Sequence, residues 1–454
     1  MSRMLPHTPM VTWFREAAPY IRAFRGRTFV VAIGGDVVAG GQLASLTHDF
    51  NLLVSLGVRL VLVHGVRPQV NQRVQAKGLP LNYHRGVRIT DADVLECVKE
   101  AVGVVRADIE ATLSMGLPST PMSNAGIRVA GGNFLIAQPL GVRDGVDMMY
   151  SGEVRRVHVE TIQQRLGEGE IVVISPLGYS PTGEAFNLTV EDTATAVATE
   201  LNADKLIFFM DDPGLTDAHG SVRLEVTTRE AREVLKKRSE QYDDIGCYLP
   251  AAIRACELGI ERVHLLSRFE DGALLLELFT HEGVGTLITR QRLERLRHAT
   301  IDDVGSILQL IEPLESEGVL VKRGRELLEM EIERFAILEH DNRTVGCVAL
   351  YPYAESGMGE LACLVVDPQF RAAGYGDLLL QAVEQRALEL GLQQLFVLTT
   401  RTAHWFCERG FAAAPVSDLP AKKQQLYNFQ RRSKVFIKPL KPSDRPLVQI
   451  VKKM

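Results

Sequence analysis

The chain of 454 residues has no long apolar run and no closely paired cysteines, and each absence excludes a class of protein. No stretch of about 18 uncharged apolar residues occurs, so a membrane-spanning helix is not expected. Arg15 and Glu16 interrupt the N-terminal stretch that could imitate a signal peptide. The absence of C-x-x-C pairs excludes a zinc ribbon and favours reduced thiols in a reducing compartment. The scattered cysteines are Cys97, Cys247, Cys256, Cys347, Cys363 and Cys407.

An excess of basic residues is also lacking. Lys and Arg number 51 against 56 Asp and Glu, which gives a net charge of −5, so nucleic acid or an anionic membrane is not expected as the main partner. With 46% apolar and 24% charged residues, the composition is that of a globular chain. At about 150 residues per domain, the length predicts two or three domains of a cytoplasmic protein.

The first part of the chain alternates short β-branched runs with stretches of helical periodicity. The runs cover residues 28–33, 58–63, 171–174, 205–210 and 262–266. This alternation predicts an α/β fold, with a mostly parallel sheet covered by helices on both faces. Small or polar residues follow several runs, where open sheets of this type place their ligands.

An amphipathic helix is predicted ahead of the first strand, over residues 10–24. Phe14, Ala17, Ile21 and Phe24 recur at three- and four-residue spacing. Pro19 lies inside this pattern and should kink or interrupt the helix. The helix could pack on its own domain or on another subunit.

Residues 290–297 form a charged segment with no apolar face of its own, and they are expected to link two domains. The predicted domains therefore cover residues 1–289 and 298–454. In the second domain, helices are expected at 302–314, 324–332, 376–390 and 403–409, and strands near 298 and at 335–338, 344–351, 359–366, 395–399 and 433–437.

The segment 361–380 carries the sharpest chemical signal. An apolar strand ends at Asp367-Pro368, a short loop follows, and a helix opens near Gly376. Unpaired backbone N–H groups and the positive end of the helix dipole meet there, which predicts an anion site. Gly374 and Gly376 have no Cβ, so a diphosphate can approach the backbone.

The pattern Arg371-x-x-Gly374-x-Gly376, followed by an apolar strand at 395–400 and by Ala403–Phe411, resembles the GNAT acyltransferase superfamily. The resemblance implies that acetyl-CoA binds as cosubstrate. Its pyrophosphate would be held by Arg371, Ala372, Ala373, Gly374, Tyr375 and Gly376. Its pantetheine would lie along the backbone of Cys363, Leu364 and Val366 and near Phe406, where the fourth and fifth strands part. A backbone N–H of that strand would stabilise the oxyanion.

The first domain resembles the amino-acid kinase family. Gly34-Gly35 and the segments 63–70 and 190–198 carry the resemblance, and segment 273–288 is similar to the arginine-binding part of arginine-inhibited members. Ala32 replaces a lysine, and Val66 and Arg67 replace glycines of the phosphate loop. A second lysine is missing from the turn at 246–250. Since phosphoryl transfer depends on positioned positive charge, we expect a regulatory module without kinase activity.

Together the two domains resemble the N-acetylglutamate synthase family. The resemblance implies transfer of an acetyl group from acetyl-CoA to the α-amino group of L-glutamate, which gives N-acetyl-L-glutamate and CoA in the first step of arginine biosynthesis. L-arginine would act as an effector on a homo-oligomer, either a hexamer or a tetramer, and no metal is expected.

Within this resemblance, Glu360 matches the general base, acting directly or through water. Thr399 matches the proton donor to the leaving thiolate, and Tyr427 is the competing donor. Arg323 and Arg431, helped by Ser433, would bind the two carboxylates of glutamate. Cys363, at the substrate, is expected to be a core thiol with backbone contacts and not a covalent acetyl carrier.

Lys205, His264, Glu277 and Gly285 match arginine-binding positions of related kinases, although a strand histidine with a purely structural role is the alternative for His264. The helix that carries Tyr20 resembles one that interlaces dimers into hexamers. Two other functions stay open: a bifunctional synthase and kinase, and a non-catalytic arginine sensor.

Overall fold

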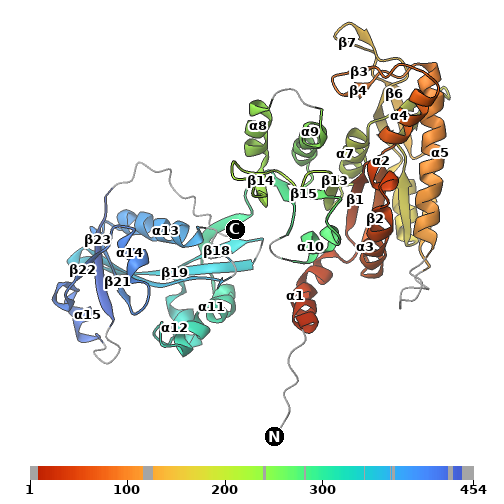
Figure 1. The fold of residues 1–454 in the computed structure, drawn as a ribbon. Helices are drawn as coiled ribbons and strands as arrows, with labels where there is room; N and C mark the ends of the chain where they lie inside the picture. Colours follow the sequence, from red (N-terminus) through yellow and green to blue (C-terminus); the bar gives the residue numbers. More distant parts are fainter. Residues whose placement is uncertain are drawn as a thin grey trace. The chain divides into compact units, whose positions relative to one another are not determined.

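The structure is a computed structural model that describes residues 9–115, 126–238, 242–280, 283–341, 343–368, 370, 374–427 and 433–441 (Figure 1). The chain divides into two compact units, Met1–Arg292 and Leu293–Met454. This division falls inside the segment 290–297. None of the helices in the described ranges combines the length and the apolar character that a membrane crossing needs.

The first unit is built on an eight-stranded sheet in the order β14-β16-β15-β13-β1-β2-β10-β5. Every neighbouring pair is parallel except β15 and β16. The α/β prediction is therefore confirmed for this unit. The strands are β1 (Thr28–Ile33), β2 (Arg59–His64), β5 (Arg128–Gly131), β10 (Glu170–Ile174), β13 (Lys205–Met210), β14 (Glu225–Thr227), β15 (Val263–Ser267) and β16 (Thr286–Thr289).

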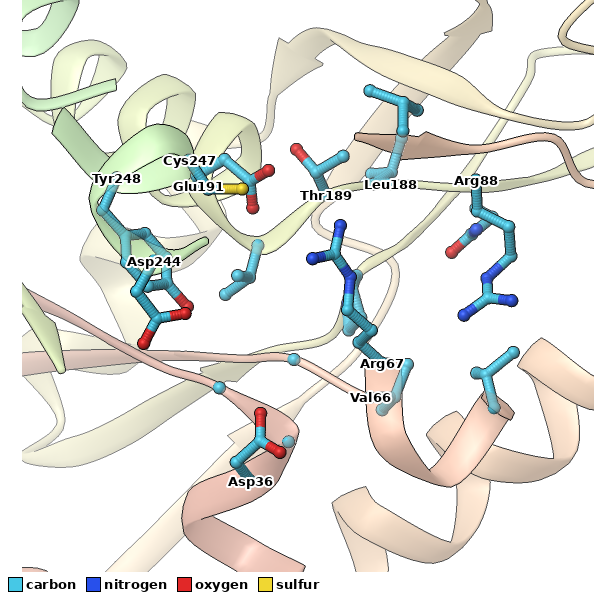
Figure 2. Close-up of a pocket in the computed structure, with 18 residues that line it drawn as sticks. Asp36, Val66, Arg67, Arg88, Leu188, Thr189, Glu191, Asp244, Cys247 and Tyr248 are labelled. Atoms are coloured by element: carbon cyan, nitrogen blue, oxygen red, sulfur yellow. The ribbon is translucent and has the colours of Figure 1, made fainter. Parts of the chain in front are cut away.

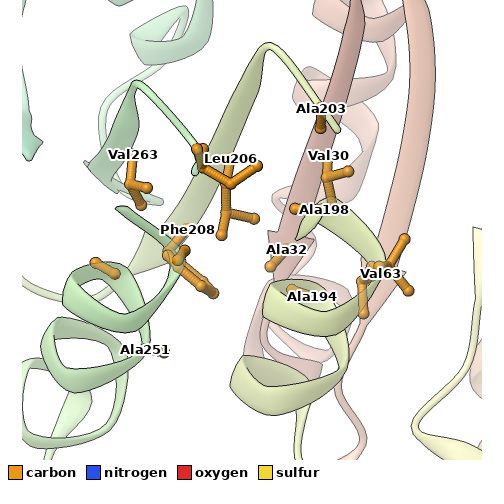
Figure 3. Packing of buried hydrophobic residues seen from close by; sticks show 14 of the residues in the cluster. Val30, Ala32, Val63, Ala194, Ala198, Ala203, Leu206, Phe208, Ala251 and Val263 are labelled. Atoms are coloured by element: carbon orange, nitrogen blue, oxygen red, sulfur yellow. The ribbon is translucent and has the colours of Figure 1, made fainter. Parts of the chain in front are cut away.

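Helices cover both faces of this sheet. One face packs against α6 (Val159–Gly167), α7 (Val190–Glu200), α8 (Thr228–Lys237) and α9 (Asp244–Glu257). The other packs against α3 (Leu43–Ser55), α4 (Arg67–Ala76), α5 (Ala92–Ser114) and α10 (Ala273–Phe279). Side chains of β1 alternate between the faces: Val30 and Ala32 face Ala194 and Ala198 of α7 (Figure 3), while Val31 faces the opposite core. The short α2 (Gly35–Ala39) follows β1.

A smaller four-stranded sheet has the order β12-β11-β6-β9. Its strands are β6 (Leu135–Pro139), β9 (Gly152–Val157), β11 (Leu177–Tyr179) and β12 (Ala185–Asn187). Two hairpins accompany it, β3 (Tyr83–His84) with β4 (Val87–Arg88), and β7 (Val142–Arg143) with β8 (Val146–Asp147). The sequence prediction did not include this sheet or the hairpins.

The N-terminal helix α1 (Pro9–Phe24) continues through Pro19, so the interruption expected there does not occur. Its second half packs on its own unit, because the Phe24 ring lies 5.3 Å from Phe29 and 5.7 Å from Phe279. Trp13 and Phe14 near its start are 38% and 56% exposed. The contact with α10 thus anchors the second half and leaves apolar side chains of the first half uncovered.

The second unit contains a seven-stranded sheet in the order β17-β18-β19-β20-β21-β23-β22. Its strands are β17 (Glu294–His298), β18 (Phe335–His340), β19 (Arg343–Tyr353), β20 (Met358–Val366), β21 (Gln394–Thr399), β22 (Ala412–Ala414) and β23 (Lys434–Pro439). One face packs on α11 (Val304–Ser316) and α12 (Arg325–Glu331), and the other packs on α13 (Tyr375–Glu389) and α14 (Ala403–Cys407). The short α15 (Ala421–Gln425) precedes β23.

The expectation that residues 290–297 form only a linker is wrong for their second half. Residues 294–297 belong to β17, which pairs with β18, and Leu296 is buried in the core. Arg297 is buried in an ion pair with Asp303 at 2.7 Å and in a second one with Glu339. The high charge of the segment therefore reflects a satisfied buried network as well as solvated side chains.

His64, at the end of β2, makes the stability of the first unit depend on pH. Its Nε2 lies 2.9 Å from Ser175 Oγ, and burial lowers its pKa from 6.5 to about 4. Between these values the unfolded chain binds a proton that the folded chain excludes. The free energy of unfolding should therefore fall as the pH drops from 6.5 to 4, by up to about 1.4 kcal/mol per pH unit.

Hydrogen-exchange protection of β1 and β2 at pH 7 and pH 5 measures this effect. His64→Gln keeps a polar group beside Ser175 without a titrating ring, so it should lose less protection on acidification than the wild type. An equal loss in both proteins would contradict the assignment to His64.

Candidate active site

One edge of β20 is left without a strand partner beyond Glu360 and could bind a ligand. β20 and β21 pair in parallel only at Met358 with Gln394, Gly359 with Leu395 and Glu360 with Phe396. Beyond that point β21 continues alongside β23, and β20 continues alongside β19. The segment 363–366 thus has no strand partner on its β21 side within the described residues. An extended ligand with amide groups can hydrogen-bond to such an edge.

Cys363 lies at the start of this free edge in an unusual backbone conformation. Its φ is +50°, and the register with β19 shifts between Cys347 and Ala349. Burial raises the pKa of the Cys363 thiol to about 11, against a smaller opposing effect of Arg323. The thiol is therefore protonated near neutral pH, which makes it a poor nucleophile. The Cys347 thiol also donates a hydrogen bond to the Cys363 carbonyl at 3.6 Å.

Glu360 lies where the two strands part. Its side chain is 9% exposed, and its Oε1 lies 2.7 Å from Nζ of Lys423. Tyr353 donates a hydrogen bond to Glu360 Oε2 at 3.5 Å, and burial together with the nearby carboxylate raises the pKa of Tyr353 to about 12. Lys423, on the five-residue α15, was not predicted from the sequence, since only the fold brings it to Glu360.

Arg323 lies close enough to Cys363 and Glu360 for their charges to affect its guanidinium. Burial lowers its pKa, but its interactions with Cys363, Tyr351 and Glu360 outweigh burial and raise it. Its guanidinium carbon lies 5.9 Å from the centre of the Tyr351 ring. Its backbone N–H donates to Glu315 at 2.8 Å, which fixes the loop before α12. A charged and half-buried guanidinium is thus available near Glu360.

The two candidate proton donors lie near one end of the sheet. Thr399 pairs with Lys434 across β21 and β23, and its Oγ1 accepts the backbone N–H of Thr402 at 3.1 Å. Tyr427 donates a hydrogen bond to the carbonyl of Ser433 at 2.5 Å. Thr399 therefore has a structural role in the following turn whatever its chemical role. Both donors remain candidates.

Gly374 and Gly376 form the start of α13. Gly374 has a φ of +78° and caps the helix, and a Cβ on Gly376 would lie 3.0 Å from Cζ2 of Trp405. Arg409 stacks on Trp405 at 4.0 Å and forms two hydrogen bonds with Asp377, so the first turn is held from its side. The predicted coenzyme residues Arg371, Ala372 and Ala373 and the predicted carboxylate ligand Arg431 lie outside the described residues.

The other residues predicted to bind the coenzyme have side chains that lie largely in the hydrophobic core. Tyr375 is 3% exposed and stacks on Phe370 at 5.7 Å, and Phe406 is 4% exposed and lies 5.3 Å from Phe411. Leu364 and Val366 are half-buried against the same core. Any contact of these residues with a coenzyme would therefore use their backbone or a small exposed surface.

In the first unit, Lys205, His264 and Glu277 form a buried chain of polar groups. His264 Nδ1 lies 2.6 Å from Glu277 Oε1, and its Nε2 lies 3.2 Å from Lys205 Nζ. Burial and the Lys205 charge lower the pKa of His264 to about 4, so the ring is neutral near pH 7. The neutral ring donates from Nδ1 to Glu277 and accepts at Nε2 from Lys205.

Glu277 also organises the loop before β16. Its Oε2 accepts backbone N–H groups from Val284 at 2.9 Å and Gly285 at 3.0 Å. Burial raises its pKa, but these bonds and the one from His264 outweigh burial and lower it to about 2. A Cβ at Gly285 would lie 2.3 Å from the Leu265 carbonyl, so the position requires glycine.

On α1, Tyr20 packs 6.2 Å from Phe24, whose ring lies 5.2 Å from Lys205 Nζ.

Comparison with known proteins agrees with this division into two folds. Residues 27–267 match the amino acid kinase family, and residues 304–411 match the acetyltransferase (GNAT) family. No group of three or more potential metal-binding side chains occurs in the part of the chain that the structure describes.

Several relatives match this chain along nearly its whole length. Amino-acid acetyltransferases from Pseudomonas putida and Azotobacter vinelandii are 53% and 52% identical to this chain over 430 residues, which cover 95% of this chain and 99% of theirs. A crystal structure of N-acetylglutamate synthase from Neisseria gonorrhoeae, complexed with coenzyme A and L-arginine, is 38% identical and covers 95% of this chain and 100% of its own, with a TM-score of 0.86. The chain belongs to the amino-acid acetyltransferase family.

Proposed function

We propose that this enzyme transfers the acetyl group of acetyl-CoA to the α-amino group of L-glutamate, giving N-acetyl-L-glutamate and CoA in the first step of arginine biosynthesis. The observation that carries the proposal is the position of the buried Glu360 at the point where β20 and β21 part. The Neisseria gonorrhoeae synthase, also crystallised with coenzyme A and N-acetyl-glutamate, supports the choice of both substrates.

The coenzyme would bind through backbone groups. Its pyrophosphate lies at residues 371–376, where Gly374 and Gly376 allow close approach to the start of α13. Its pantetheine arm adds to the free edge of β20 at Cys363, Leu364 and Val366. A backbone N–H of this edge stabilises the thioester oxygen as it becomes an oxyanion.

Glutamate would bind with its carboxylates on Arg323 and Arg431, assisted by Ser433. Glu360 accepts a proton from the α-ammonium, and the free amine attacks the thioester carbon. The carbon–sulfur bond then breaks and the CoA thiolate takes a proton from Thr399 or Tyr427. The attached nitrogen loses its extra proton as the amide forms, and this proton restores the hydroxyl of the donor. The raised pKa of the Cys363 thiol makes it a poor nucleophile, which favours direct transfer over an acetyl-enzyme.

Thiol release from acetyl-CoA, measured across a panel of amino acids, tests the substrate assignment. Glutamate should give a kcat/KM about 10- to 100-fold above neutral amino acids, since these keep the α-carboxylate but lose the side-chain carboxylate and its charge-assisted contact with an arginine. Aspartate is the matched control, because it has the same groups on a shorter side chain. Equal rates with glutamate and neutral amino acids would refute the proposal.

The first unit would sense L-arginine through Lys205, His264, Glu277 and Gly285. Glu277 supplies the negative charge for a cationic end of the effector, and Lys205 supplies the positive charge for its carboxylate. The helix α1 with Tyr20 packs beside this site and would transmit the effect to a homo-oligomer, a hexamer or a tetramer.

The free state of the described cysteines supports a cytoplasmic location.

Glu277→Gln should raise the arginine concentration needed for a half-maximal effect by about tenfold or more. The amide can still accept the two backbone N–H groups at Oε1, so the loop before β16 should persist while the charge is lost. Acetyl transfer without arginine should stay within about twofold of the wild type. A full arginine response in this variant would contradict the assignment of the site.

Kinase activity is proposed to be lost. Ala32, at a position where working kinases have a lysine, is buried against α7 (Figure 3). Arg67 lines a cavity at the carboxyl ends of β1 and β2 (Figure 2), where glycines would leave room for a phosphate. ATP-dependent phosphorylation of N-acetylglutamate would instead establish a bifunctional enzyme. A protein that binds coenzyme A but releases no thiol would be a non-catalytic sensor, an outcome that the buried Glu360 argues against.

A further inference from the structure

Lys423 forms an ion pair with Glu360 from which much of the solvent is excluded. Its Nζ lies 2.7 Å from Glu360 Oε1, and the two side chains are 19% and 9% exposed. The attraction within such a pair is largely offset by the hydration that both charges lose, so the pair adds little to stability by itself. A buried Glu360 carboxylate without Lys423 would, however, carry an uncompensated charge.

The two oxygens of the Glu360 carboxylate have different surroundings. Lys423 contacts Oε1 at 2.7 Å, and Tyr353 donates a long hydrogen bond to Oε2 at 3.5 Å. A hydrogen bond of this length is weak, and it leaves room for a second donor at Oε2. Oε1 is therefore occupied by the lysine, while Oε2 is the oxygen that a substrate ammonium can reach.

The short helix α15 is fixed to the sheet beside Glu360, which keeps Lys423 in place. Gln424, the residue after Lys423, donates a hydrogen bond from Nε2 to the Leu419 carbonyl at 2.7 Å. Leu419 is 3% exposed and belongs to the same apolar cluster as Phe396 of β21. Phe396 is in turn the strand partner of Glu360. The lysine is thus anchored to the point where β20 and β21 part.

We propose that Lys423 is a positioning residue for the general base: it holds Oε1 of Glu360 and so presents Oε2 to the α-ammonium of glutamate. This role depends on the proposed function, since it requires Glu360 to be the base. During proton transfer an N–H bond of the ammonium breaks, its electron pair stays on the nitrogen, and an O–H bond forms at Oε2. The proton then passes to water before the next turnover.

Lys423→Met should lower kcat for glutamate acetylation by about 10- to 100-fold, because a base displaced by about 1 Å loses activity on this scale. The KM for acetyl-CoA should stay within about twofold of the wild type, since the coenzyme contacts are not changed. Lys423→Arg keeps the charge and should hold kcat within about fivefold of the wild type. Thiol release at varied glutamate and acetyl-CoA concentrations measures these constants.

Lys422→Met is the matched control. Lys422 is the neighbouring residue on α15, but its side chain is 74% exposed, and its partner Glu355, 3.4 Å away, is 86% exposed. An ion pair in this setting contributes little, so kcat should stay within about twofold of the wild type.

The effect of Lys423→Met should also depend on Glu360. In the Glu360→Gln background it should change the remaining rate by less than about twofold, because no base is left to position. This background contains no carboxylate that loses its partner, so it separates a change of position from a failure to fold.

The role of Lys423 is overturned if Lys423→Met turns over like the wild type or lowers the rate equally in both backgrounds. It is also overturned if only the KM for glutamate rises, as expected of a residue that binds a substrate carboxylate. These results leave the proposed function standing when the wild type releases thiol with glutamate. A wild type that releases none overturns both.

Discussion

Replacement of Glu360 by glutamine is expected to lower kcat for glutamate acetylation by about 10²- to 10⁴-fold, the usual contribution of a general base. Glutamine keeps the size of the side chain and one acceptor oxygen but cannot accept the ammonium proton. The KM for acetyl-CoA should change little, because the proposed coenzyme contacts are made by the backbone of β20 and by the turn before α13. Initial rates of thiol release at saturating glutamate measure the effect.

Glu333→Gln is a suitable control, since Glu333 is an exposed carboxylate in the same unit and should leave kcat unchanged. A higher pH should partly restore the rate of the Glu360→Gln variant, because more glutamate then carries a free amine. Turnover within about twofold of the wild type at neutral pH would exclude Glu360 as the base, while the fold assignment would stand.

Gly376→Val should raise the KM for acetyl-CoA by about 100-fold. The added side chain would meet Trp405, whose Cζ2 lies 3.0 Å from the position of the new Cβ. Arg409 lies over the Trp405 ring at 4.0 Å and limits the movement of Trp405, so we expect the start of α13 to shift. Overpacking of this kind costs about 1–3 kcal/mol, and the shift would displace the backbone proposed to bind the pyrophosphate.

Gly305→Val provides a closely matched control. Gly305 is the second residue of α11, as Gly376 is of α13, but a Cβ added at Gly305 would have no atom within 4 Å apart from its own helix and chain neighbours. This variant should keep the wild-type KM for acetyl-CoA and a similar melting temperature. An unchanged KM in Gly376→Val would remove the turn from the coenzyme site.

Much of the fold could be predicted from periodicity in the sequence. The apolar runs at 28–33 and 205–210 coincide with β1 and β13, because a strand buried on both faces is apolar along its whole length. The helix expected at 376–390 is observed as α13 at Tyr375–Glu389, directly after its N-cap Gly374. The family assignment, which required two motif sets in order, is confirmed.

The remaining features depend on contacts between distant residues. The strands of the four-stranded sheet in the first unit are at most six residues long, too short for a clear alternating pattern. Lys423 has no local signal, because its ion pair with Glu360 joins residues far apart in the chain. Arg297 falls in the predicted charged linker because a sequence does not show that Asp303 and Glu339 neutralise it in the core.

A crystal structure of the protein with bound coenzyme A tests the central proposal most directly. We expect the pyrophosphate at residues 371–376, the pantetheine arm hydrogen-bonded along β20 from Cys363 to Val366, and the sulfur within reach of Glu360. Coenzyme bound elsewhere, away from residues 363–366 of β20 and from the turn before α13, would contradict the proposal.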